Sequence, residues 1–60
     1  MTGVDYVLTE LGVTKAGLAR LLSISRQQVQ QWEYIPRKYA KVLVDVHGLD
    51  LYAMTYGVDE

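Results

Sequence analysis

The chain has 60 residues, half of them hydrophobic, and it contains no cysteine. This length predicts one small domain over residues 1–60, and the composition excludes disulfides and thiolate metal sites. Six basic and seven acidic side chains leave a net charge of −1, in a composition typical of a globular chain. No apolar run approaches the roughly 18 residues of a membrane span, and no signal-peptide pattern is present. We therefore expect a soluble cytoplasmic domain.

The first third of the chain predicts two short amphipathic helices. Over residues 2–11, apolar residues recur at helical spacing, with Thr2 as the N-cap and Gly12 just past the end. A second helix over residues 15–22 follows the N-cap Thr14. The expected apolar faces are Val4, Val7, Leu8 and Leu11 in the first helix, and Leu18, Ala19, Leu21 and Leu22 in the second.

The middle of the chain predicts a short polar turn, Ser23-Ile24-Ser25, and two further helices. The last residue of the turn and Gln28 form a capping box, so a third helix is expected over Arg26–Glu33. Pro36 is favoured at the first position of a fourth helix, and Gly48 is suited to end it. The apolar face of the fourth helix is expected to be Tyr39, Val42, Leu43 and Val46.

The tail, residues 49–60, leaves two alternatives open. A short helix capped by Asp50 and an extended edge strand both fit its apolar pattern, and the helix is preferred. The tail is more apolar than a small monomer easily hides, which predicts a dimerisation surface. The alternative is that the tail folds back and completes the core of one chain. The residues concerned are Leu49, Leu51, Tyr52, Met54 and Tyr56.

Charge is distributed unevenly along the chain. Residues 14–41 carry all six basic side chains against the single acid Glu33, a sum of +5. Residues 1–13 sum to −2 and residues 42–60 to −4. A basic middle between acidic ends indicates a surface that faces a polyanion.

The usual components of an enzyme are missing from the sequence. There is no cysteine nucleophile and no glycine-rich phosphate loop, and His47 is the single histidine. A lone histidine among scattered carboxylates predicts neither a zinc site nor general acid–base chemistry. We therefore expect no catalysis, no metal and no cofactor.

The segment contains a helix of about eight residues, a three-residue turn and a second helix. These lengths match those of a helix-turn-helix. Ala19 lets the two helices cross closely, while Ile24 and Trp32 fill the space between them. The third helix then keeps a polar outer face with nothing to pack against. Arginine pairs with guanine and glutamine with adenine in the major groove. The side chains expected to contact bases are Ser25, Arg26, Gln27, Gln30 and Gln31.

The segment from Lys15 to Trp32 resembles the helix-turn-helix of the small phage Cro-type repressors, which belong to the lambda-repressor-like DNA-binding proteins. The resemblance covers about residues 4–47, with Ser23 standing where the family usually has a glycine of positive φ. It implies a compact all-α domain of four or five helices, in which Ser25, Arg26, Gln27 and Gln31 contact base edges and nearby phosphates. The matching positions are Ala19, Ile24, Val29, Trp32, Ile35 and Pro36.

These features together predict a transcriptional repressor that acts by occupying a double-stranded DNA operator. A homodimer, formed either in solution or only on DNA, would read two half-sites about 34–36 Å apart. The alternative is a helix-turn-helix module that binds a protein partner, such as an antitoxin or an antirepressor; the acidic tail and the pI of about 5.7 favour it. The side chains expected to contact phosphates are Lys15, Gln28, Tyr34, Arg37, Lys38 and Lys41.

Overall fold

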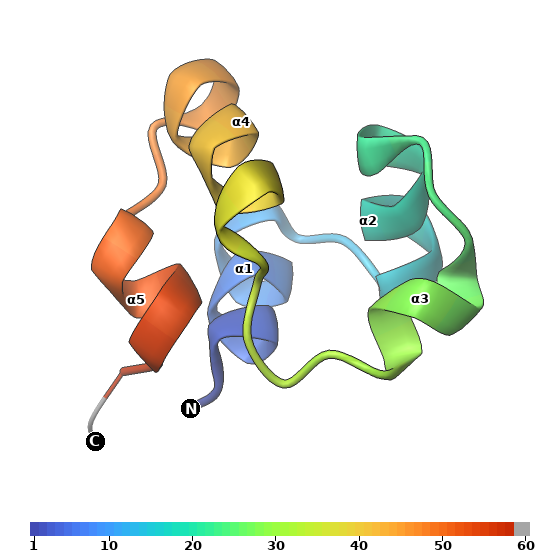
Figure 1. Cartoon of the computed structure of the whole chain (residues 1–60), viewed down its shortest axis with the longest axis horizontal. Helices are drawn as coiled ribbons and strands as arrows, with labels where there is room; N and C mark the ends of the chain where they lie inside the picture. The colour runs from blue at the N-terminus through green and yellow to red at the C-terminus, as the bar shows by residue number, and fades with distance from the viewer. Residues whose placement is uncertain (59–60) are drawn as a thin grey trace.

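The computed structural model describes residues 1–58, which form five α-helices and no strand. In Figure 1, α1 lies near the centre, with α4 above it, α5 to the left, and α2 and α3 to the right. No helix within the described residues is long and apolar enough to cross a membrane. Residues 59 and 60, the end of the predicted tail, lie outside the described part. The helices are α1 Gly3–Leu11, α2 Lys15–Leu22, α3 Arg26–Gln30, α4 Arg37–His47 and α5 Leu51–Tyr56.

The first two helices begin and end where the sequence predicts. The Thr2 hydroxyl accepts a hydrogen bond from the Asp5 N–H at 3.1 Å, and the Thr14 hydroxyl accepts one from the Gly17 N–H at 3.1 Å. Gly12 ends α1 in the left-handed conformation, at a φ of 64°. These caps satisfy backbone groups that each helix would otherwise leave without a partner.

The third helix is shorter than predicted, because it ends at Gln30 and not at Glu33. Its start is confirmed, since the Ser25 hydroxyl accepts a hydrogen bond from the Gln28 N–H at 3.1 Å. The chain then leaves the helix to pair with α1, where the Val4 N–H donates to the Glu33 carbonyl at 3.1 Å. A hydrogen bond to a helix that is distant in the sequence therefore sets the end of α3. No residue near the end of α3 predicts it from the sequence.

The fourth helix differs from the prediction at its start. Pro36 is its N-cap rather than its first helical residue, with an extended ψ of 142°. The Pro36 carbonyl accepts hydrogen bonds from the N–H groups of Tyr39 and Ala40 at 3.0 and 2.9 Å. Gly48 ends α4 in the left-handed conformation, as predicted.

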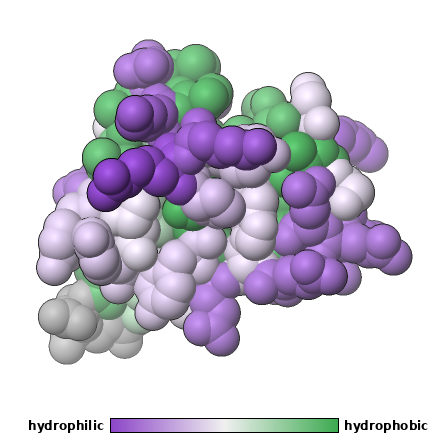
Figure 2. All heavy atoms as spheres, in the orientation of Figure 1, coloured by the Kyte–Doolittle hydropathy of each residue, from purple (hydrophilic) through white to green (hydrophobic). Residues whose placement is uncertain are grey.

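The predicted apolar face of α4 is wrong in part. Ala40 and Leu43 are buried, whereas Val42 is 47% exposed and Val46 is 68% exposed. Hydrophobic surface lies over the upper part of α4 in Figure 2. Three valines at positions 42, 44 and 46 surround the helix, so periodicity alone fits more than one face. Leu21 of α2, also predicted to be apolar core, is likewise largely exposed.

The tail forms a helix, so the edge-strand alternative is wrong. One oxygen of the Asp50 carboxylate accepts hydrogen bonds from the N–H groups of Tyr52 and Ala53 at 2.8 and 3.2 Å. The α5 backbone touches α1 so closely that a Cβ at Gly3 would lie 1.9 Å from the Met54 carbonyl oxygen. The tail is thus part of the folded domain.

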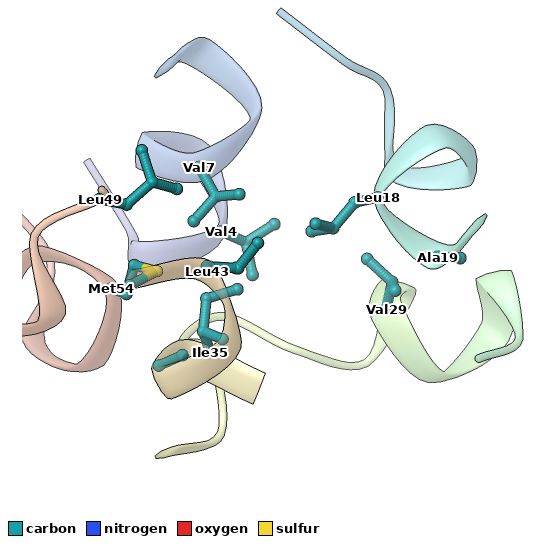
Figure 3. Close-up of a cluster of buried hydrophobic side chains, with 10 residues drawn as sticks. Val4, Val7, Leu18, Ala19, Val29, Ile35, Leu43, Leu49 and Met54 are labelled. Carbon is teal, nitrogen blue, oxygen red and sulfur yellow. The ribbon is translucent and has the colours of Figure 1, made fainter. Parts of the chain in front are cut away.

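One hydrophobic core joins all five helices (Figure 3). Side chains of α1, α4 and α5 meet at Val7, Leu43 and Met54. Leu18 of α2 and Val29 of α3 point toward this group from the other side. Burial of these large apolar side chains positions the α2–α3 pair against the rest of the domain.

Candidate nucleic-acid interface

The turn between α2 and α3 fixes the position of α3. Ser23 has a φ of 58°, the left-handed conformation that a glycine adopts more easily. Its N–H donates to the Arg20 carbonyl at 3.2 Å, and the Ile24 N–H donates to the Ala19 carbonyl at 3.0 Å. The turn therefore closes α2 with backbone hydrogen bonds and redirects the chain into α3.

Small and branched side chains fill the contact between α2 and α3. Ala19 and Val29 are buried, and Ile24 packs half-buried against the same core. Trp32 is also half-buried, and its ring centroid lies 5.3 Å from that of Tyr39 at the start of α4. This position confirms the core assignment of Trp32.

The outer face of α3 is polar and open. Val29 is its one buried residue, while the remaining side chains of the helix are exposed. In Figure 2, hydrophilic side chains gather over α3. No acidic residue lies within α3, so nothing on the helix itself repels a phosphate or a carbonyl edge. Every predicted base-contacting residue is exposed: Ser25, Arg26, Gln27, Gln30 and Gln31.

Exposed basic side chains lie on the two helices that neighbour α3 in the sequence. Lys15 is exposed at the first position of α2, and Arg37 and Lys38 are exposed in the first turn of α4. The Lys38 ammonium lies 4.9 Å from the centre of the Tyr39 ring, which itself packs on Trp32. Hydrophilic surface covers the start of α4 on the viewed face of Figure 2. Exposed basic side chains thus stand on the helix that precedes α3 in the chain and on the helix that follows it.

The other predicted phosphate-contacting residues occupy different positions. Gln28 is exposed on α3, and Tyr34 is exposed in the loop between α3 and α4. Lys41 lies one turn further along α4 and lines a groove beside α5. The structure therefore places Lys41 apart from the first turn of α4.

The predicted dimerisation residues divide into two groups. Leu49 and Met54 are buried in the core, so the core-completing alternative describes them. Leu51, Tyr52 and Tyr56 remain exposed on α5, and the two tyrosine rings pair with their centroids 4.7 Å apart. Tertiary contacts decide which of these residues are buried, because apolar character alone does not distinguish a core residue from an interface residue.

Two exposed residues were missed at the sequence level, Val42 and Val46, because their spacing matched a core stripe. Ala40 is fully buried on a different side of α4, so the core face of the helix runs through Ala40 and Leu43 and not through the two valines.

No protein-family model, no curated protein and no solved structure matches the chain. The candidate interface presents exposed arginine and glutamine side chains on a short helix, and further exposed basic side chains stand on α2 and α4. Such a surface suits a ligand that is both anionic and rich in hydrogen-bonding edges.

Proposed function

We propose that this protein is a sequence-specific double-stranded DNA-binding protein of the helix-turn-helix class, with α2 and α3 as the motif. The observation that carries the proposal is the composition and exposure of α3. It buries Val29 alone and presents arginine and glutamine side chains outward, without any acid. A helix that packs one side chain into the core and exposes all the others is shaped to enter the major groove.

Base reading belongs to the side chains that begin and line α3. The guanidinium of Arg26 matches the O6 and N7 acceptors of guanine, and the amide of Gln27 matches N6 and N7 of adenine. Gln31 caps the helix with an αR backbone, so its side chain continues the same face. Ser25 and Gln30 complete the base-contacting set that we propose.

Phosphate contacts position the motif without reading sequence. Lys15 at the start of α2 and Arg37 and Lys38 at the start of α4 supply the positive charge on either side of α3. Gln28 and Tyr34 add neutral hydrogen-bond donors. The net charge of −1 makes non-specific DNA binding weak, so discrimination depends on base contacts.

The protein would act as a Cro-type repressor, since occupancy of an operator is enough to exclude a polymerase. One short recognition helix contacts few base pairs, and two copies related by a two-fold axis double the contact. We therefore propose a homodimer on a two-fold symmetric operator.

Selection from a pool of random DNA duplexes, followed by fluorescence anisotropy on the enriched sequence, tests the proposal. We expect the unmodified chain to enrich a two-fold symmetric site. Arg26→Ala and Gln27→Ala should each weaken binding to it by about 5- to 150-fold, the range for loss of a bidentate base contact. Thr9→Ala, an exposed change on α1, is the matched control and should bind as the unmodified chain does.

The protein-interaction module remains the alternative, and the same experiment separates it. The exposed Tyr52–Tyr56 ring pair on α5 is the observation that favours a protein partner. Under this alternative no duplex is enriched at any salt concentration. Amide shifts of ¹⁵N-labelled protein would also stay unchanged at Lys15, α3 and the first turn of α4 when DNA is added.

A further inference from the structure

The outer face of α4 carries side chains that a solvent-exposed helix rarely needs. Val42 and Val46 lie one turn apart on this face, and they are 47% and 68% exposed. β-Branched residues are weaker helix formers than the lysine, glutamate or glutamine usual at such positions. Neither helix propensity nor solvation accounts for the two valines, which indicates a surface that a partner covers.

A groove runs beside this face, between α4 and α5. Its volume is about 280 Å³, and it is lined by Lys41, Val44, Asp45 and Leu51. Leu51, at the start of α5, is itself 38% exposed. Lys41 and Asp45 form one edge of the groove and lie next to the two exposed valines on the helix surface. These four residues therefore form one continuous exposed face, which we name the α4 face: Lys41, Val42, Asp45 and Val46.

The charges on the α4 face are arranged to complement a second copy of the same face. Lys41 precedes Asp45 by one helical turn, which is the less favourable order for a pair within one helix. In an antiparallel pair of α4 helices related by a two-fold axis near Leu43, Lys41 of each copy lies beside Asp45 of the other. The same operation interleaves Val42 and Val46 of both copies along the seam. A two-fold interface requires such a self-complementary patch.

We propose that the α4 face is where two copies of this chain associate, with their α4 helices antiparallel. The proposal deepens the dimer of the proposed function, but its test needs no DNA. It replaces the tail as the dimerisation surface and assigns Lys41 to the partner chain rather than to phosphate.

The position of the α4 face in the molecule and the area that it can bury agree with a dimer interface. In Figure 1, the end of α4 and α5 lie on the far side of the molecule from α3, so association there leaves both α3 helices uncovered. An 11-residue helix is about 16 Å long, so the buried area falls at the small end of specific interfaces. We therefore expect a weak, concentration-dependent dimer that a two-site DNA ligand would strengthen.

Analytical ultracentrifugation of the free chain, over micromolar to millimolar concentration, tests the proposal. We expect a monomer–dimer equilibrium that Val46→Lys weakens by at least about tenfold, since each dimer loses two apolar contacts. Leu21→Lys is the matched control, because Leu21 is also an exposed apolar residue but lies on α2. It should leave the dimer constant unchanged.

A charge exchange tests the antiparallel arrangement. Lys41→Glu and Asp45→Lys should each weaken the dimer by about 3- to 10-fold, because like charges then face across the two-fold at two places. The double variant should restore the original constant. Circular dichroism at 222 nm verifies that each variant is folded. A chain that stays monomeric throughout, equal effects of Val46→Lys and Leu21→Lys, or no restoration in the double variant would each overturn the proposal.

Discussion

At the scale of single residues, Ser23 is the position where the residue type is poorly suited to the backbone conformation. It is the one non-glycine residue with positive φ among residues 1–58. The left-handed region costs an L-residue about 1–2 kcal/mol, because Cβ approaches the following carbonyl oxygen. The fold tolerates this because the turn must redirect the chain from α2 into α3.

Replacing Ser23 with glycine should therefore stabilise the domain. We expect a gain of about 0.5–1 kcal/mol, since the added entropy of the unfolded glycine offsets part of the relieved strain. The melting temperature should rise by about 2–8 °C in a thermal scan followed by circular dichroism.

Gly12→Ala provides the matched control for this backbone argument. Gly12 has a similar φ of 64°, and nothing lies within 4 Å of an added Cβ. The substitution should lower the melting temperature through conformation alone. A Ser23→Gly variant that melts no higher than the unmodified chain would contradict the assigned strain.

Residues that act locally are those that the sequence predicted well. Thr2, Thr14, Ser25 and Asp50 all cap helices as expected, because each side chain bonds a backbone N–H two or three residues further on. A cap depends on a few neighbouring residues and on no distant contact. The same locality explains why the glycines that end α1 and α4 were predicted.

At the scale of elements, α5 is a six-residue helix that owes its stability to packing. A helix this short is unstable alone in water. Its Met54 is fully buried, and the Met54 carbonyl accepts a hydrogen bond from the Ile35 N–H at 2.9 Å. The tail therefore holds the loop that joins α3 to α4 as well as completing the core.

Met54→Ala should destabilise the domain by about 2–5 kcal/mol, because it opens a cavity in a small core. A domain of this size has only about 3–5 kcal/mol from its core, so the variant should be largely unfolded at 25 °C by chemical denaturation. Met54→Leu, which keeps the volume, should lose less than about 1.5 kcal/mol. Tyr52→Ala, at a residue 69% exposed on the same helix, should change stability by less than about 0.5 kcal/mol. The reverse order of Met54→Ala and Tyr52→Ala would contradict the assignment of α5 to the core.

Element boundaries and faces were predicted less well than caps. The end of α3 and the orientation of α4 both depend on partners far away in the sequence, namely Val4 for the Glu33 carbonyl and the shared core for Ala40. Valines at alternate positions of α4 fit several faces equally. Periodicity limits the choices, and packing selects among them.

At the scale of the whole molecule, all six basic side chains belong to residues 14–41, the segment that includes α2, α3 and the start of α4, while the acidic ends lie outside it. The proposed DNA surface is thus locally positive on a chain of net charge −1. Binding to a polyanion releases counterions in proportion to the phosphates that are neutralised. The slope of log K for DNA binding against log salt therefore reports how many cationic side chains contact phosphates.

Lys15→Gln should lower the magnitude of the slope of log K against log salt by about 1 for each bound copy. The measurement is fluorescence anisotropy with a labelled duplex between about 50 and 200 mM salt, the range in which phosphate contacts dominate the change. Glu10→Gln, an exposed change on α1, is the control and should leave the slope unchanged. Equal slopes for Lys15→Gln and the unmodified chain would remove Lys15 from the phosphate-contacting set.

The sequence by itself determined the all-α class, the start of every helix except α4 and the polar character of the α3 surface. These follow from capping, periodicity and composition, which act over a few neighbouring residues. Tertiary structure alone decided that Leu49 and Met54 belong to the core and that Val42 and Val46 face outward. The physical reason is that burial belongs to the assembled fold: an apolar side chain is core only where another element comes to cover it.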